Sequence, residues 1–320
     1  MINATTDWTD PLDVISVRDL GKSYDDHEAV RGVSFGVRRG EVFALLGPNG
    51  AGKTTITETL EGYRLRDAGD VRVLGHDPGR GERALRERIG IVLQECGVQA
   101  DLSVIELLRL YGRLYPRRRQ VDELVELVGL SDRRNARAGE LSGGQRRRLD
   151  LALALVGDPE VLFLDEPTTG FDPSARRAAW QTVRDLRELG TTIFLTTHFM
   201  DEAQHLADRI AVMRDGRIVA TGTPAELGGR DHAPSDIRFT LPARAGVAAT
   251  AVPLADGARL QAVGLGAGTV HVVAADPVAA AARITAWALE RGLELGGFEI
   301  TRPTLEDVYL TLTEARSPTS

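Results

Sequence analysis

Gly47-Pro-Asn-Gly-Ala-Gly52-Lys53-Thr54 is the stretch of sequence that decides the fold. It fits the phosphate-loop pattern G-x-x-x-x-G-K-[ST], which requires a strand before it and a helix after it. The apolar run from Glu41 to Leu46 predicts that buried strand, and a helix is expected from Lys53 to Glu61. The alternative, an ordinary glycine-rich turn, explains neither flanking element.

The chemistry of such a loop depends on its backbone and on one lysine. The glycines allow backbone N–H groups to point at phosphate oxygens, and the following helix adds the positive end of its dipole. Lys53, one of only two lysines in the chain, supplies a compact charge for the β- and γ-phosphates. The Thr54 hydroxyl would bind Mg²⁺. The residues expected to bind nucleotide here are Gly47, Pro48, Asn49, Gly50, Ala51, Gly52, Lys53, Thr54 and Thr55.

A second glycine motif, Leu141-Ser142-Gly143-Gly144-Gln145, precedes a segment rich in Arg and Leu. Ser142 and two glycines at the start of a helix predict another anion site. Because one nucleotide rarely needs two such sites in one chain, the pair predicts a dimer in which each subunit covers the other's γ-phosphate. Read alone, the motif could also be a turn followed by a capped helix.

This pentapeptide, behind a phosphate loop, resembles the signature motif of the ABC ATPase family, and the resemblance spans about 14–227. It implies an α/β fold: an ABC ATPase cassette with a P-loop NTPase core, an antiparallel β subdomain and a helical subdomain. We expect the cassette over 12–228, its helical subdomain at about 95–140, and a small C-terminal α+β domain over 235–320.

The resemblance also assigns roles to an acidic strand end and a histidine. In Val161-Leu-Phe-Leu-Asp165-Glu166, Asp165 would bind Mg²⁺ and Glu166 would act as general base on the attacking water. His198 corresponds to the switch histidine, which contacts the γ-phosphate and orients Glu166. Without this context, solvated acids and a structural histidine are the ordinary readings of such strand ends.

Further residues correspond to family positions that contact nucleotide. Gln94 would sense Mg²⁺ and the γ-phosphate and form the hinge of the helical region. Asp172 would touch the partner's phosphate loop, and Tyr24 would stack on adenine, although an isolated Tyr is often only a surface residue. The signature residues expected at the nucleotide are Ser142, Gly143, Gly144 and Gln145.

The remaining segments are expected to form strands and helices as follows. Helical spacing of leucines predicts helix through most of 103–130, with a capping box formed by Ser103 and Glu106. Further strands are expected at 14–17, 33–37, 89–93, 161–164 and 192–196, with a helix at 173–189 that makes the last two parallel. A hairpin at 210–220 follows, then strands at 237–241, 269–274 and 295–300 and helices at 277–291 and 304–312.

Composition limits the function classes. The charge of 39 − 46 = −7 argues against a general nucleic-acid binder. No run approaches the roughly 20 apolar residues of a spanning helix, and 1–10 lacks the features of a signal peptide. Cys96 is the only cysteine, which excludes an intrachain disulfide. These features fit a cytosolic protein, and the resemblance to the ABC family implies a peripheral protein at the cytoplasmic face of the membrane, with another chain spanning it.

Two segments indicate which ABC machine this is. Thr197-His-Phe-Met-Asp-Glu-Ala203 and Pro303-Thr-Leu-Glu-Asp-Val-Tyr-Leu-Thr-Leu-Thr313 resemble the bacterial drug- and polyketide-exporting group, which includes the daunorubicin-resistance type. The resemblance implies an ATP- and Mg²⁺-dependent ATPase that forms a homodimer under integral membrane permease subunits, binds no nucleic acid and powers efflux of a drug-like or natural-product substrate. An importer ATPase, a soluble ABC ATPase acting on nucleic acid or ribosomes, and an inactive adaptor are the alternatives.

Overall fold

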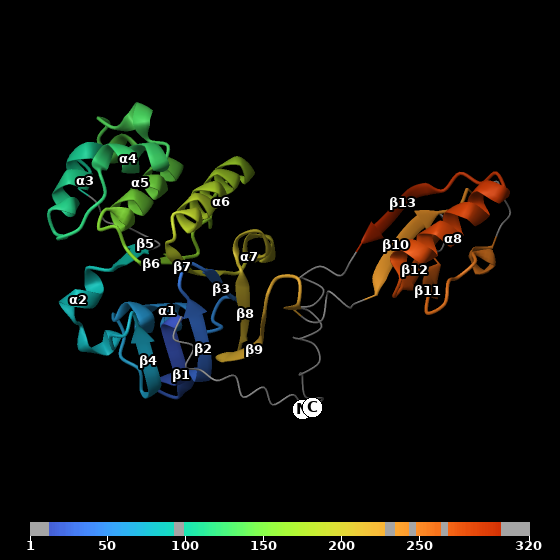
Figure 1. Cartoon of the computed structure of the whole chain (residues 1–320), viewed down its shortest axis with the longest axis horizontal. Helices are drawn as coiled ribbons and strands as arrows, with labels where there is room; N and C mark the ends of the chain where they lie inside the picture. Colours follow the sequence, from blue (N-terminus) through green and yellow to red (C-terminus); the bar gives the residue numbers. More distant parts are fainter. Residues whose placement is uncertain (1–12, 93–98, 228–233, 243–247, 264–267, 302–320) are drawn as a thin grey trace. The chain divides into compact units, whose positions relative to one another are not determined.

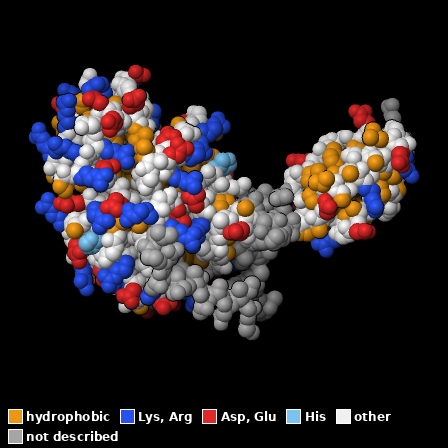
Figure 2. Space-filling model, viewed as in Figure 1, with side chains coloured by type: hydrophobic (Ala, Val, Ile, Leu, Met, Phe, Trp, Pro, Cys, Tyr) orange, Lys and Arg blue, Asp and Glu red, His pale blue; other side chains and the backbone are white. Residues whose placement is uncertain are grey.

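The computed structural model describes residues 13–92, 99–227, 234–242, 248–263 and 268–301, and the chain divides into two compact units, Met1–Pro224 and Ala225–Ser320 (Figure 1). Each unit has its own hydrophobic core. Among the described residues, no helix combines the length and apolar character needed to cross a bilayer. On the face drawn in Figure 2, acidic and basic side chains are interspersed over the first unit.

A six-stranded sheet in the order β5-β6-β7-β3-β8-β9 forms the centre of the first unit. All neighbouring pairs from β5 to β8 are parallel, as predicted for 161–164 and 192–196, and β9 is antiparallel to β8. Strand β3 is buried along its whole length, which explains its unbroken apolar sequence. The strands are β3 (Val42–Leu46), β5 (Ile89–Val92), β6 (Val161–Asp165), β7 (Thr192–Thr197), β8 (Arg209–Arg214) and β9 (Arg217–Gly222).

A three-stranded antiparallel sheet, β2-β1-β4, completes the β structure of this unit. The short strands expected at 14–17 and 33–37 are parts of longer ones, β1 (Asp13–Tyr24) and β2 (His27–Arg38), and β4 (Ala68–Val73) was not predicted. Three stacked rings join the two sheets. Phe35 of β2 lies 5.3 Å from Phe43 of β3, and both rings lie 6.0 Å from Phe194 of β7.

The helices of the first unit follow the predicted spacing, with one interruption. The predicted helical region 103–130 is divided into α3 (Val104–Gly112) and α4 (Val121–Leu127), because Pro116 lies between them and disfavours helix at the residue before it. The capping box of Ser103 and Glu106 is confirmed. The other helices are α1 (Lys53–Glu61), α2 (Arg83–Arg86), α5 (Gly143–Leu155), α6 (Pro173–Glu188) and α7 (Met200–Leu206).

The second unit is a four-stranded antiparallel sheet, β11-β12-β10-β13, with α8 (Pro277–Glu290) packed on one face. Its strands are β10 (Ser235–Thr240), β11 (Arg259–Val263), β12 (Thr269–Ala274) and β13 (Gly296–Thr301), of which only β11 was not predicted. Alternate residues of β10, such as Phe239, pack with Ile284 and Trp287 of α8. The predicted helix 304–312 lies outside the described residues.

Candidate active site

The phosphate loop leaves the carboxyl end of β3, between β7 and β8, and leads directly into α1. Gly52 caps α1 with φ +100°, and no side chain caps the helix, so its first N–H groups remain directed at the loop. A Cβ at Gly52 would lie 2.5 Å from the carbonyl oxygen of Ala29, and one at Gly47 would lie 2.6 Å from that of Met213. Gly52 is therefore required both by its φ and by close backbone approach, and Gly47 by close backbone approach alone.

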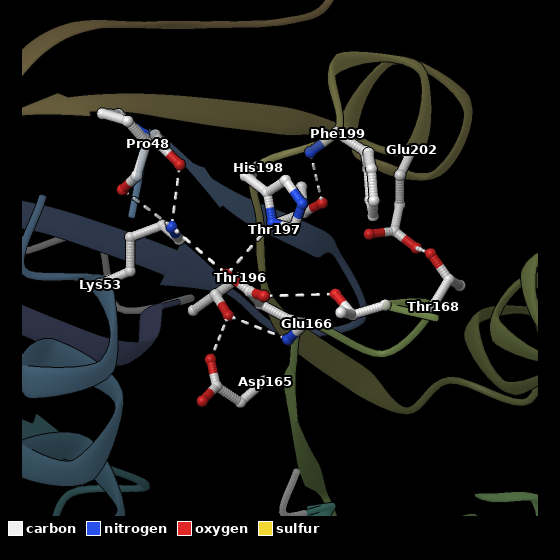
Figure 3. Close-up of polar contacts among 12 residues, drawn as sticks. Pro48, Lys53, Asp165, Glu166, Thr168, Thr196, Thr197, His198, Phe199 and Glu202 are labelled. Atoms are coloured by element: carbon white, nitrogen blue, oxygen red, sulfur yellow. Dashed lines mark hydrogen bonds and ion pairs between the residues drawn. The ribbon is translucent and has the colours of Figure 1, made fainter. Parts of the chain in front are cut away.

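Lys53 is buried at the start of α1, with its ammonium group turned back into the loop (Figure 3). It donates hydrogen bonds to the carbonyl oxygens of Gly47 at 2.8 Å and Pro48 at 3.1 Å. Its Nζ also lies 3.5 Å from Oε1 of Glu166. Burial lowers the pKa of Lys53, and the Glu166 carboxylate opposes that change. A triphosphate would supply the negative charge that this buried ammonium needs.

Two carboxylates stand at the carboxyl end of β6, the strand two places from β3. Burial raises the pKa of Asp165, whose Oδ1 accepts a hydrogen bond from the Thr196 hydroxyl. Glu166 has a left-handed backbone conformation, with φ +46°, and its N–H donates to the backbone oxygen of Thr196 at 3.1 Å. Thr169 donates to Oε2 of Glu166 at 3.2 Å. This strained backbone directs Glu166 away from the line of the strand and into the site.

His198 follows β7, which lies between β6 and β3, so all three strand ends reach the same edge of the sheet. Its Nδ1 lies 3.3 Å from Oε1 of Glu166, the oxygen that also faces Lys53. The ring packs on Phe199 with centroids 4.1 Å apart. One carboxylate oxygen therefore meets an imidazole and an ammonium group, an arrangement in which a base is oriented next to a phosphate site.

Lys53 and Glu166 line a cavity of about 1310 Å³, whereas Asp165 and His198 are not among its lining residues. Tyr24 lines this cavity, and its hydroxyl oxygen lies 3.5 Å from that of Thr55. The Arg64 guanidinium lies 5.0 Å from the centroid of the Tyr24 ring. Of the predicted residues, the cavity is lined by Tyr24, Asn49, Gly50, Gly52, Lys53, Thr54, Thr55, Gly143, Gly144 and Glu166. The same cavity is therefore lined by most of the predicted loop residues and by two glycines of the signature motif.

The signature segment forms the start of α5. Ser142 caps the helix by accepting from the N–H of Gln145 at 3.3 Å, and the Gln145 side chain accepts from the Ser142 N–H at 3.0 Å. Gly143 and Gly144 have open space where a Cβ would stand, so another molecule can approach their backbone closely. Arg147 of the same helix donates to the backbone oxygen of Asp165 at 3.2 Å.

Asp172 caps α6, and Gln94 lies outside the described residues. The Asp172 carboxylate accepts hydrogen bonds from the N–H groups of Ala175 and Ser174 and from the Ser174 hydroxyl, which lower its pKa. Asp172 and Ser142 line a second cavity, of about 840 Å³, between α5 and α6. In this structure Asp172 is therefore a helix cap on an exposed surface.

Thr196 and Thr169 are site residues that the sequence analysis missed. Thr196 holds both Asp165 and the backbone of Glu166, and Thr169 holds the Glu166 carboxylate. Thr169 belongs to the segment directly after the acid pair, a signal that could have been used. Thr196 lies 30 residues from Glu166 in sequence, and only the parallel pairing of β6 and β7 brings them together.

A phosphate loop on a central parallel strand, with an acid pair at the end of a strand two places away in the same sheet, defines the class: a P-loop nucleotide hydrolase. A family model described as ABC transporter matches residues 30–169, and one described as the C-terminal domain of ABC transporter domain-containing protein-like matches 235–304. Daunorubicin resistance ATP-binding protein DrrA3 of Streptomyces coeruleorubidus is 40% identical over 311 residues, covering 93% of this chain and 95% of that protein.

Two further relatives agree. Nod factor export ATP-binding protein I of Burkholderia lata is 45% identical over 222 residues, 68% of this chain and 73% of that protein. The structure of cbiO1 of Clostridium perfringens, described as part of the ABC transporter complex cbiONQ, matches with TM-score 0.60 and 31% identity over 67% of this chain and 90% of that one. The chain belongs to the ABC transporter ATP-binding family and is a transport-coupled ATPase.

Proposed function

We propose that the chain powers efflux of a drug-like or natural-product substrate through a separate membrane permease. Two relatives support export, since one carries daunorubicin resistance in its name and another Nod factor export. The observation that carries the ATPase mechanism is the Glu166 carboxylate, which lies between Lys53 and His198 at the mouth of the phosphate loop.

The mechanism follows from these contacts. The N–H groups at the start of α1 and the Lys53 ammonium bind the β- and γ-phosphates, replacing the contacts of Lys53 with the oxygens of Gly47 and Pro48. Glu166 orients the attacking water and takes its proton as general base. His198 holds that carboxylate on the side of the γ-phosphate. Tyr24 stacks on adenine at the opposite part of the cavity.

Thr54 and Asp165 fit a Mg²⁺ ion. Mg²⁺ prefers oxygen ligands and is commonly held by one or two protein groups together with substrate phosphates. Thr54 offers a hydroxyl in the cavity, and Asp165 is a half-buried carboxylate whose pKa is raised mainly by burial, so a bound cation would offset that cost. The bound ion would neutralise charge on the β- and γ-phosphates. Gln94, outside the described residues, is the third proposed ligand.

Two copies complete the site in this proposal. The N-terminus of α5 in one copy, with Ser142, Gly143, Gly144 and Gln145, covers the γ-phosphate held by the other, where its dipole and free N–H groups favour negative charge. Asp172 contacts the partner copy near the phosphate loop. ATP favours the closed pair because it binds both surfaces there and only one in the open state, so hydrolysis reopens it.

The proposed partners and location complete this function. The helical region at about 95–140 contacts the permease, and Gln94 links its position to the bound nucleotide. The chain then lies at the cytoplasmic face of the membrane as a peripheral subunit. The domain bounds 12–228 and 235–320 belong to the same proposal, with the C-terminal domain stabilising the dimer.

Glu166→Gln tests the mechanism. The amide keeps the shape of the side chain but cannot act as base, so ATP turnover should fall at least a hundred-fold while ATP still binds. Size-exclusion chromatography with ATP should then show an accumulated dimer. The control is Glu160→Gln, at the other end of the β6 region, where Glu160 pairs with Arg39 and Arg88 away from the cavity. A Glu166→Gln protein that stays monomeric and hydrolyses ATP normally removes Glu166 from the mechanism.

A further inference from the structure

Glu202 of α7 is a buried carboxylate that the proposed mechanism does not use. Its side chain is fully buried, and it lines neither of the two cavities at the site. Oε1 accepts a hydrogen bond from the Thr168 hydroxyl at 2.7 Å (Figure 3). It also accepts one from the Trp180 indole N–H at 3.2 Å. A buried carboxylate is costly unless it is fully engaged, so its position here requires a reason.

The groups around Glu202 come from the segments that carry the proposed catalytic groups. Thr168 lies two residues after Glu166, in the loop that leaves β6. Thr197 directly precedes His198, and its hydroxyl accepts from the N–H of Phe199 at 2.9 Å. Burial raises the pKa of Glu202, and the hydroxyls of Thr197 and Thr168, followed by the indole of Trp180, oppose that rise. Glu202 therefore lies among the loop after β6, the end of β7 and helix α6.

We propose that Glu202 is a positioning residue that fixes the loop after Glu166 against the strand end before His198. The Glu166 backbone is left-handed and keeps its conformation only if its surroundings hold it there. The Thr196 contacts hold it from the strand side, and the contact of Thr168 with Glu202 holds the following loop. Without that second contact, the Glu166 carboxylate loses its fixed position beside His198.

This inference rests on the proposed roles of Glu166 and His198, and it predicts a separation between turnover and binding. Glu202 touches neither the phosphate loop nor the cavity, so its loss should leave ATP affinity intact and lower the rate of hydrolysis. Thr168 allows the mildest test, because Thr168→Val keeps the shape of the side chain and removes the hydroxyl. Thr168→Ser keeps the hydroxyl and should rescue activity.

The experiment measures kcat, KM and the ATP dissociation constant of the full chain. Thr168→Val and Glu202→Met, which has no oxygen to accept the hydrogen bond, should each lower kcat at least ten-fold and change KM and ATP affinity less than two-fold, whereas Thr168→Ser should keep kcat within three-fold. The double variant Thr168→Val/Glu202→Met should be no slower than the slower single variant, since both remove the hydrogen bond between residues 168 and 202.

The matched control is Thr192→Val. Thr192 is a fully buried threonine at the opposite end of β7, where its hydroxyl accepts from the N–H of Gly40 at 2.9 Å. It should lower thermal stability as Thr168→Val does and leave kcat unchanged. The proposal is overturned if Thr168→Val loses only stability, or if it raises KM with kcat unchanged. Full turnover by Glu166→Gln would instead refute the proposed role of Glu166 itself.

Discussion

Glu61 gives a pH-dependent stability that can be worked out from the structure. It is the last residue of α1, it is 9% exposed, and burial raises its pKa from 4.5 to about 8, with Asp165 and Glu58 adding to the rise. Unfolded, this carboxyl loses its proton near pH 4.5, and folded it keeps the proton up to about pH 8. Between these values the folded state holds a proton that the unfolded state lacks, so stability falls as pH rises.

The size of the effect follows from linkage. Each pH unit in that window costs about 1.4 kcal/mol, and the loss levels off above the folded pKa. Glu61→Gln removes the titration, so the variant should gain about 1 kcal/mol over the wild type near pH 5.5 and about 4 kcal/mol near pH 7.5. The expected gain in stability is greatest in the upper part of the window, because there ionisation of Glu61 favours the unfolded state of the wild type most strongly.

Urea unfolding at a series of pH values between 5.5 and 8.5 measures this gain. The double substitution Trp8→Phe and Trp287→Phe as the background leaves Trp180 as the remaining tryptophan, so that its fluorescence follows the first unit. Glu28→Gln is the control, because Glu28 belongs to the same unit, has 57% of its side chain exposed and pairs with Arg31. If the Glu61→Gln and wild-type curves stay parallel from pH 5.5 to 8.5, the folded carboxyl does not hold its proton and the reasoning is refuted.

Three further outcomes are expected. Gly52→Ala should destabilise the chain by about 3 kcal/mol and Gly50→Ala by about 1 kcal/mol in thermal scans, because both have positive φ but only Gly52 meets a backbone oxygen, that of Ala29; equal losses would contradict the clash. Tyr24→Ala should weaken ATP binding about ten-fold by calorimetry and Tyr24→Phe less than three-fold, if the ring and not the hydroxyl binds adenine; equal losses would implicate the hydroxyl. Truncation after Leu227 should weaken the ATP-dependent dimer in size-exclusion runs, and an unchanged dimer would remove that role from the second unit.

The strands and helices that the sequence predicted are those fixed by local patterns. The phosphate loop, the capped helix at Ser103 and the parallel pair β6 and β7 were all marked by residues within a short window. Strand β4 was missed because 68–73 is exposed and polar at its start and owes its conformation to pairing with β1. The break at Pro116 shows that the spacing of leucines alone does not reveal where one helix ends and the next begins.

The site was predicted unevenly for the same reason. Motifs located Lys53, Glu166 and His198, but their meeting at one carboxylate oxygen depends on the order of strands in the sheet, which short motifs do not contain. Thr196 carried no motif of its own, and Glu202 lies within the stretch 197–203 but was given no role there. Their roles arise from contacts between segments about 30 residues apart, so the sequence alone did not show them.

The stack of Phe35, Phe43 and Phe194 has a consequence for which nucleotides fit the proposed site. Its rings pack the three-stranded sheet, in which β1 ends at Tyr24, against the six-stranded sheet, in which β3 leads into the phosphate loop. In the proposed function, Tyr24 and the phosphate loop therefore hold the base and the phosphates at a fixed separation. A nucleotide whose base and terminal phosphate are spaced differently would contact either Tyr24 or the phosphate loop, but not both.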